Sequence, residues 1–345
     1  MIPFPKVVSF TITNKCNLSC KVCGQWGARG YLKDAAGKDP LAELPVDVWK
    51  RLVDEVAAHA GAVIAIRGGE PFLYPGIIEL LSYIKEKGLF VSMDTNGSLL
   101  SRYAEDIVRL KIDHITLSVD GPEEVHDRVR GVTGSFRKLA EGVARVRELS
   151  LQAGRPSCIG AVCCVISPES YEGLAAMPDV VRRLGIPGIA IVPYYYCNAA
   201  TGKVHEKYLK EELGCERARW KGFQSECGRI DTGKFLEEFR KFKAALKDVA
   251  LIPFMPFAGQ DYVTWFTDCT TSVGRPDCGN PWRLVDIQPD GDANFCVDFP
   301  DYILGNITHA SIEDVWNSPA ADRFRRSLTA RPLPLCARCG AKYMV

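Results

Sequence analysis

Three cysteines stand close together near the start of the chain, in the stretch TNKCNLSCKVCGQWG (residues 13–27). Cys16, Cys20 and Cys23 are separated by three residues and then by two. A closed zinc or iron–sulfur site normally takes four protein ligands, so this set is one ligand short. Either a distant His or Cys completes a zinc site, or three thiolates hold a four-iron cluster whose remaining iron binds a ligand that is not protein.

A second set of cysteines lies near the C-terminus. Cys278 and Cys296 are followed by Cys336 and Cys339, which form a C-x2-C pair in the stretch LPLCARCG. Four thiols with this pair can close either a zinc ribbon or an auxiliary four-iron cluster, and the spacing alone does not distinguish the two. Unlike the first set, this one has a full complement of ligands.

The composition limits the partners of these sites. The 345 residues carry 43 Lys plus Arg against 42 Asp plus Glu, so no basic field indicates nucleic acid or an anionic membrane. No apolar run approaches the ~20 residues of a membrane helix, and the N-terminus lacks a signal-peptide pattern. We therefore expect a cytoplasmic protein, in which fourteen cysteines indicate metal ligation rather than disulfides.

Residues 7 to about 195 repeat one pattern, a short β-rich apolar run followed by an amphipathic helical stretch. The predicted strands are 7–13, 62–66, 90–93, 114–119, 159–166 and 189–193, and the predicted helices lie near 47–59, 76–87, 101–110, 135–150 and 170–184. Such an alternation implies right-handed crossovers and a parallel sheet, either open or curled into a partial barrel. In both arrangements a ligand site lies at the C-terminal ends of the strands.

Each unusual motif directly follows one of these strands. The three-cysteine loop follows the first strand, and the next three strands are followed by RGGEP (67–71), DTNG (94–97) and DGPEEVHDRVRG (120–131). Loops that a rigid scaffold positions are where binding and catalytic residues concentrate. Four such loops on one rim therefore predict a single site.

The pattern changes after Tyr196. Residues 203–248 predict polar helices, and the tail from about residue 266 contains a predicted hairpin (282–297) and a helical stretch near 311–328. We therefore expect an α/β domain over 1–200, a helical bridging segment over 201–265 and a small cysteine-rich α+β domain over 266–345.

Taken together, these motifs resemble a known family. The C-x3-C-x2-C spacing after a first strand, followed by GGEP after the second, resembles the radical S-adenosylmethionine (SAM) superfamily. The C-terminal cysteines, with LGNITHASIEDVWNSPAADRFR (304–325) between their halves, resemble the SPASM/Twitch type of auxiliary domain. The resemblance covers most of the chain and implies a partial (β/α)6 TIM-like barrel followed by the cysteine-rich domain.

The resemblance also implies roles for the loops. Cys16, Cys20 and Cys23 would hold a [4Fe-4S] cluster whose free iron is chelated by the amino and carboxylate groups of SAM. Glu70 would accept hydrogen bonds from that amino group, and Arg130 suits the carboxylate. The full set of predicted cofactor contacts is Gly68, Gly69, Glu70, Pro71, Thr95, Asn96, Ser118 and Arg130.

For the second set, we expect the shorter Twitch form with one auxiliary [4Fe-4S] cluster, because the chain stops six residues after Cys339. Its ligands would be Cys278, Cys296, Cys336 and Cys339, and Cys269 could replace one of them, since full SPASM proteins use an additional upstream cysteine. Cys197, just beyond the sixth strand, is a candidate hydrogen-atom donor to a substrate radical. We expect most other cysteines to be small buried hydrophobes: Cys158, Cys163, Cys164, Cys215 and Cys227.

Family chemistry implies reductive cleavage of SAM to a 5′-deoxyadenosyl radical that abstracts hydrogen from a C–H bond. Because the first strand begins at residue 7, without a preceding leader-binding domain, we expect oxidation of a small polar metabolite such as a sugar, cyclitol or amino-acid derivative. The alternatives are a maturase that crosslinks, oxidises or epimerises a ribosomal peptide, and a non-enzymatic iron–sulfur or zinc scaffold. A flavodoxin or ferredoxin would serve as electron donor.

Overall fold

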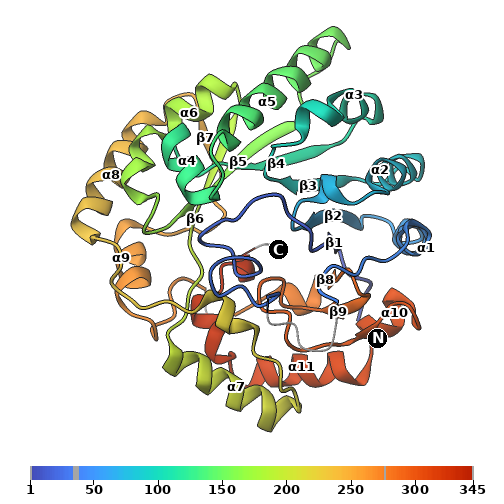
Figure 1. Ribbon diagram of the computed structural model, residues 1–345. Coiled ribbons are helices and arrows are strands. Elements are labelled where there is room, and N and C mark those ends of the chain that lie inside the picture. The colour runs from blue at the N-terminus through green and yellow to red at the C-terminus, as the bar shows by residue number, and fades with distance from the viewer. Residues whose placement is uncertain (1, 34–38, 276, 344–345) are drawn as a thin grey trace.

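The computed structural model describes residues 2–33, 39–275 and 277–343. Its strands form one ten-stranded sheet in the order β10-β9-β8-β1-β2-β3-β4-β5-β6-β7 (Figure 1). The bounds of the strands are β1 Val7–Thr13, β2 Val63–Gly68, β3 Val91–Thr95, β4 His114–Ser118, β5 Ile159–Ile166, β6 Gly188–Pro193, β7 Ala250–Leu251, β8 Leu284–Ile287, β9 Asp292–Asn294 and β10 Gly305–Asn306.

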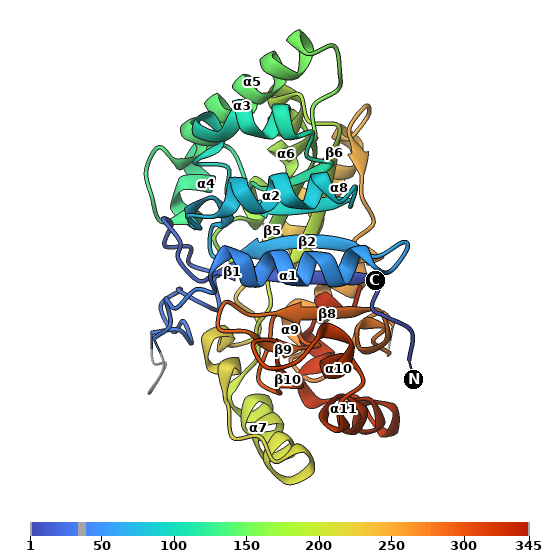
Figure 2. The ribbon, with the colours of Figure 1, turned by 90° about the vertical axis from the view of Figure 1, so that its right-hand side faces the viewer.

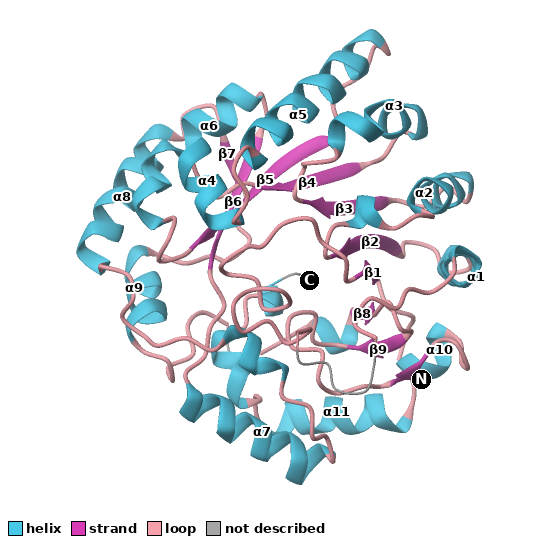
Figure 3. Ribbon diagram, in the orientation of Figure 1, coloured by secondary structure: helices cyan, strands magenta, loops and turns pink. Residues whose placement is uncertain are grey.

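The strands β1 to β6 run parallel and pair in chain order, as the alternating pattern predicts. The sheet curves into a partial barrel with helices outside and loops gathered inside (Figure 3). The α/β class and the TIM-like partial barrel expected from the sequence are confirmed. The helices of this half are α1 Val46–Ala57, α2 Ile77–Glu86, α3 Leu100–Leu110, α4 Glu123–Arg130, α5 Ser135–Gln152 and α6 Met177–Leu184.

The two faces of the barrel strands differ in their exposure. Along β2 and β4, buried residues such as Ile64 and Leu117 alternate with half-buried ones. On β3, Asp94 is exposed although both of its neighbours in the chain are buried. Because alternate side chains of a strand point to opposite faces, one face packs under the helices and the other lines the barrel interior. On β2, β3 and β4 the inner face is therefore partly exposed and carries polar side chains such as Arg67 and Asp94.

The C-terminal part continues the same sheet. Strand β8 pairs in parallel with β1, while β9 and β10 add antiparallel strands at the far edge (Figure 2). The fully buried carboxylate of Asp286 on β8 accepts hydrogen bonds from the hydroxyls of Ser9 and Thr11 on β1, at 2.6 and 3.1 Å. Helices α10 (Ile312–Trp316) and α11 (Pro319–Ala330) cover this extension. The C-terminal part is thus joined to the barrel by the main-chain pairing of β8 with β1 and by the buried hydrogen bonds of Asp286.

The segment between the two halves contains α7 (Ala199–Leu213), α8 (Thr232–Ala245) and α9 (Gly259–Thr267). The sequence predicts polar helices here but gives no separate signal for α9. It also leaves α4 as a loop, because its eight residues, EEVHDRVR, carry just two apolar side chains and no helical repeat. In the described part of the chain, no helix is long and apolar enough to cross a lipid bilayer.

Candidate functional site

The three-cysteine loop leaves the C-terminal end of β1, and all three thiols are free and half-buried. Cys16 and Cys20 line a cavity of about 600 Å³ together with Leu18 and Trp26. The cavity is bounded on another side by Glu169 and Arg229, whose charged groups lie 3.4 Å apart. The Sγ of Cys23 accepts a hydrogen bond of 3.3 Å from the backbone N–H of Trp26. The loop thus presents thiols to a space large enough for a small molecule.

Helix α4 holds this loop in place. The backbone N–H groups of Ser19 and Lys21 donate to the carbonyls of Arg130 and Val129, at 3.1 and 2.9 Å. Gly131 follows the helix with φ +71°, and a Cβ there would lie 2.5 Å from the carbonyl oxygen of Ser19. A glycine is needed because no larger residue tolerates both this conformation and this contact.

Arg130 brings a positive charge to one thiol. Its Nε lies 2.7 Å from Oδ2 of Asp120, and its Nη1 lies 3.8 Å from the Sγ of Cys20. Burial alone would lower the pKa of Arg130, but Asp120 and the Cys20 thiol raise it above its ordinary value. Burial raises the pKa of Cys20, and Arg130 opposes that rise. Arg130 thus bridges the carboxylate of Asp120 and the thiol of Cys20, and its predicted contact to a cofactor carboxylate stays a prediction.

The two glycines of RGGEP allow the second loop to approach the first. A Cβ on Gly68, whose φ is +143°, would lie 2.4 Å from the Thr13 carbonyl oxygen, and one on Gly69 would lie 2.2 Å from that of Lys15. In the resulting contact the N–H groups of Gly69 and Glu70 donate to those same two oxygens, each at 2.8 Å. The two glycines therefore let the second loop pack directly against the cysteine loop.

Glu70 links three loops from a fully buried position. Its carboxylate accepts hydrogen bonds from the Thr95 hydroxyl at 2.7 Å and from the backbone N–H groups of Asn96 and Phe72 at 2.9 and 3.2 Å. Burial raises its pKa, and these three donors oppose the rise. The side-chain amide of Asn96 in turn donates to Asn17 in the cysteine loop, at 3.0 Å. The predicted residues Glu70, Thr95 and Asn96 thus come together.

Two other predicted contacts lie on the same rim. Pro71 is buried at the start of a short 3-10 helix, Pro71–Leu73, and Ser118 is half-buried at the end of β4, paired with Cys163 on β5. The four motif loops therefore converge as the sequence predicts, while individual contacts to SAM stay predictions.

The four C-terminal cysteines come from separate segments and converge on one another. Cys278 precedes the 3-10 helix Asn280–Trp282, Cys296 follows β9, and Cys336 and Cys339 belong to the turn after Pro334. Burial raises the pKa of Cys296 well above its ordinary value, and the neighbouring thiols Cys336, Cys339 and Cys278 raise it further. We call this group of four free thiols the auxiliary cage.

Asp298 and Tyr195 interact electrostatically both with Arg67 on β2 and with the auxiliary cage. Burial raises the pKa of Asp298 to about 6, although Arg67 on β2 opposes the rise. The Tyr195 hydroxyl has a pKa well above its ordinary value, because of burial first and then because of Asp298 and Cys339. Sequence reasoning missed Asp298 and Tyr195. The available signal was an acidic residue two positions after a predicted ligand, Cys296, in a buried stretch.

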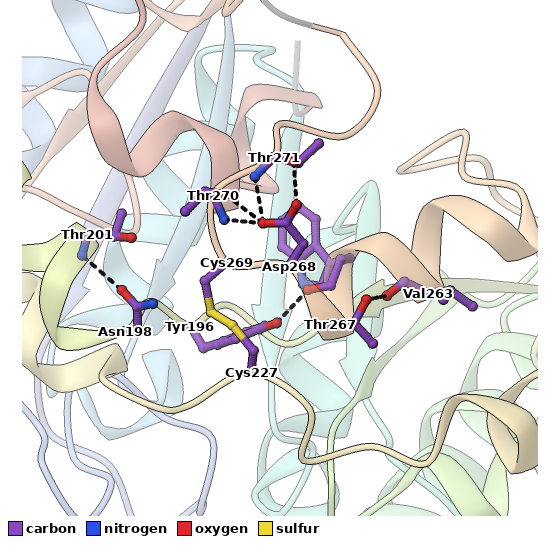
Figure 4. The surroundings of a disulfide bond; sticks show 11 residues. Tyr196, Asn198, Thr201, Cys227, Val263, Thr267, Asp268, Cys269, Thr270 and Thr271 are labelled. Atoms are coloured by element: carbon purple, nitrogen blue, oxygen red, sulfur yellow. Dashed lines mark hydrogen bonds between the residues drawn. A yellow bond between two sulfur atoms is a disulfide. The ribbon is translucent and has the colours of Figure 1, made fainter.

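Cys269 lies outside the auxiliary cage. It forms a disulfide with Cys227, with a Cα–Cα distance of 6.0 Å, beside Tyr196 and Asp268 (Figure 4). The pairing joins the end of α9 to the loop before α8, forty-two residues away in sequence. The structure thus gives Cys269 a partner other than the four predicted ligands, and it shows a disulfide where the composition indicates metal ligation.

Cys197 is fully buried, and its Sγ is directed at the carbonyl of Trp220, 3.8 Å away. It belongs to a small apolar cluster with Trp220, Phe299 and Leu335, against which Cys296 and Cys339 pack. Burial raises its pKa to about 12. Its role as a hydrogen donor stays a prediction, and it lies beside the auxiliary cage.

The spacing of the thiols bears on which metal they suit. Among the residues that the structure describes, no three His, Cys, Asp or Glu side chains converge closely enough to ligate a single metal ion. A four-iron cluster spreads its ligands over the corners of a cube, so its thiols lie farther apart than those around one ion. Both sets consist of free thiols, which is the ligand type that such a cluster takes.

Comparison with known proteins identifies two family matches. Residues 10–172 match the radical SAM superfamily, and residues 278–340 match an iron–sulfur cluster-binding domain of the SPASM type. The first match contains the three-cysteine loop and the motifs that follow β2, β3 and β4. The second contains all four thiols of the auxiliary cage.

Similar proteins include ones named for porphyrin synthesis and for bacteriocin biosynthesis. The chain is 28% identical to an Fe-coproporphyrin III synthase of Methanosarcina barkeri, over 65% of this chain and 55% of that protein, so it spans about half of that relative. It is 25% identical to the antilisterial bacteriocin subtilosin biosynthesis protein AlbA of Bacillus subtilis, over 99% of this chain and 68% of that protein. Streptococcus suis SuiB, solved bound to its precursor peptide SuiA, shares the fold with a TM-score of 0.63 at 15% identity, over 98% of this chain and 71% of SuiB.

Proposed function

Because the chain belongs to the radical SAM superfamily and carries a SPASM-type iron–sulfur domain, we propose that it oxidises a side chain of a peptide substrate. When bound, the first cluster and SAM supply a 5′-deoxyadenosyl radical that takes a hydrogen atom from an unactivated C–H bond. A flavodoxin or ferredoxin supplies the electron for cleavage. The residues of the chain hold these groups, position the substrate and exclude water.

One observation carries this proposal: polar side chains of the barrel interior act on the auxiliary cage, while the three-cysteine loop borders a cavity at the rim of the same barrel. The three-cysteine loop borders the 600 Å³ cavity at the rim, and Arg67 and Asp298 connect the inner face to the auxiliary cage. A substrate radical must lose one electron and one proton to give an oxidised product. A cluster held by the auxiliary cage would serve as the electron acceptor for that step.

The charge of the inner face favours a peptide over a tetrapyrrole. Arg67 stands among Asp94, Asp286 and Asp298, and burial would lower its pKa if these carboxyls did not raise it above its ordinary value. Of these carboxyls, Asp94 is exposed and Asp298 is half-buried, and both would repel a substrate with several carboxylates. A neutral or basic side chain of a peptide meets no such repulsion. The near full-length match to a protein of bacteriocin biosynthesis, and the fold shared with a peptide-bound enzyme, support the same choice.

A small polar metabolite, the substrate class expected from the sequence, is the second candidate. The hydroxyl, carboxyl and guanidinium groups of the inner face can bind a sugar or a cyclitol as well as a side chain. The two candidates differ in size, so they can be separated by direct assay.

The test is to reconstitute the protein anaerobically and to measure 5′-deoxyadenosine with SAM, a reductant and peptides encoded beside its gene. We expect one peptide to increase 5′-deoxyadenosine formation and to lose two hydrogens by mass spectrometry. The C16A variant with the same peptide is the control for cluster-dependent chemistry. Stimulation by sugars or cyclitols alone would instead support the second candidate and overturn the first.

A further inference from the structure

A lysine lies at the auxiliary cage with almost no exposure to solvent. Lys342 is three residues after Cys339 and is 2% exposed. Its Nζ lies 3.3 Å from the Val273 carbonyl oxygen and 3.4 Å from the Ser272 hydroxyl, on the segment that leads to Cys278. The ammonium group therefore donates its hydrogen bonds to uncharged acceptors inside the protein.

The opposite charges that act most on Lys342 come from the thiols of the cage. Lys342 also acts on the carboxylate of Asp277, but that carboxylate pairs with Arg275, 3.2 Å away. Burial lowers the pKa of Lys342, and the thiols of Cys339, Cys336 and Cys278 oppose that fall. Reciprocally, burial raises the pKa of Cys336, and Lys342 acts against the rise. A buried ion needs a partner to offset its desolvation, and the thiolates of a bound cluster would supply one for Lys342, three residues after Cys339.

We propose that Lys342 is a positioning residue that raises the reduction potential of the auxiliary cluster through its buried positive charge. A cluster bound by four thiolates carries one more negative charge in its reduced form than in its oxidised form. A nearby cation therefore stabilises the reduced form more, and net charge, hydrogen bonds to the sulfurs and solvent exposure are what set such potentials. Because Lys342 is shielded from water, its effect is screened far less than that of a surface charge.

This inference rests on the proposed function only in its consequence for catalysis. A higher potential makes the auxiliary cluster a better acceptor for the electron that a substrate radical gives up. The potential itself is measured without any substrate, so a failure of this inference is distinguishable from a failure of the peptide proposal.

The side chain and the backbone of Lys342 make different contacts, so a substitution can remove the charge of the side chain and keep the backbone hydrogen bond. The backbone N–H hydrogen-bonds to the Cys339 sulfur and lowers its pKa, while burial, the largest cause, raises it. Replacing the side chain leaves this backbone contact in place. A change of the cluster potential in a side-chain variant therefore reports the ammonium charge.

Arg275 offers a matched control. It also acts on Cys278, where burial raises the pKa and Arg275 opposes the rise. However, its side chain is 37% exposed, and its Nη2 lies 3.2 Å from Oδ2 of Asp277. Solvent and this carboxylate screen its charge, so R275Q should change the potential of the cluster much less than K342Q.

The experiment is a redox titration of the anaerobically reconstituted full chain, followed by electron paramagnetic resonance, for wild type, K342Q, K342M, K342R and R275Q. In K342Q and K342M we expect the auxiliary cluster to shift to a lower potential. K342R should stay near wild type because it keeps the charge, and R275Q should shift little. The three-cysteine cluster in each sample is an internal reference that should not move.

Three results would overturn the inference. The first is an unchanged auxiliary potential in K342Q and K342M samples that retain about eight iron atoms per chain, the content of two four-iron clusters. The second is loss of the auxiliary cluster in both variants with the first cluster intact, which would make Lys342 an assembly residue. The third concerns K342R, which keeps the positive charge. A shift of the auxiliary potential in K342R as large as in K342M would show that the shape of the side chain, and not its charge, sets the potential.

Discussion

The two thiol sites differ in how completely the protein surrounds them. The three-cysteine loop borders a cavity of about 600 Å³, and a buried arginine, Arg130, stands beside one of its thiols. The auxiliary cage gathers four thiols from separate segments, with the buried Lys342 beside them. One site is short of a protein ligand and open to a small molecule, while the other is complete. The comparison separates a site suited to binding SAM from one suited to electron transfer.

Removing a thiol from the open site should have the largest effect. In C16A, C20A or C23A, the cluster that binds SAM has too few protein ligands, so we expect no detectable 5′-deoxyadenosine. Iron should fall from about eight to about four atoms per chain, because the auxiliary cluster remains. Chromatographic assay of 5′-deoxyadenosine and iron analysis measure both.

C158A is the matched control, because Cys158 is a half-buried thiol at the start of β5 that belongs to neither predicted set. It should keep both the iron and the cleavage activity. Persistent SAM cleavage in all three variants of the loop would break the distinction between the two sites.

Removing a thiol from the auxiliary cage should separate cleavage from turnover. C336A or C339A should lose about four iron atoms and still cleave SAM, because the first cluster and its cavity are untouched. Product formation should stop, because the substrate radical has lost its electron acceptor. The measurement is the ratio of product to 5′-deoxyadenosine. If both variants turned over normally, the auxiliary assignment would be wrong.

Much of this comparison could be predicted from the sequence because it rests on local patterns. The barrel strands follow from apolar runs bounded by turn residues, and β1 and β5 have the predicted bounds, 7–13 and 159–166. The motif loops follow from their position after the strands, since parallel strands bring those ends to one rim. The hydrogen bonds between Glu70, Thr95 and Asn96 are the structural consequence.

The remainder depends on contacts between residues far apart in the chain. The ion pair of Arg130 with Asp120 arises because α4 forms in a stretch that has no apolar repeat. The disulfide of Cys227 and Cys269 spans forty-two residues, and no local pattern indicates it. Lys342 is an ordinary lysine in the sequence, and only the folding of the tail against residues 272–273 buries it.

A smaller effect should come from the backbone contact that supports the open site. In G69A, a Cβ would lie 2.2 Å from the Lys15 carbonyl oxygen, so the two loops must separate. We expect a loss of about 3 kcal/mol in the free energy of unfolding, typical of overpacking a rigid contact. Denaturant unfolding of the metal-free protein measures this loss.

The matched control is G88A. Gly88 has φ +71° and no heavy atom within 4 Å of a built Cβ, so alanine there meets backbone strain alone and should cost about 1 kcal/mol. Equal losses in the two variants would show that the close approach of the loops contributes nothing to stability.

The smallest effect on the metal sites should come from Cys269, the residue that decides whether the auxiliary cage has four thiols or more. Cys269, just after α9, forms a disulfide with Cys227 and is not part of the auxiliary cage. C269S should therefore keep about eight iron atoms and an unchanged auxiliary signal in electron paramagnetic resonance. C227S should behave in the same way, whereas C278S should lose about half of the iron. A loss of about four iron atoms in C269S, but not in C227S, would place Cys269 among the ligands. The auxiliary site would then be built with a spare thiol, and the contrast between an open and a closed site would rest on the cavity beside the first loop alone.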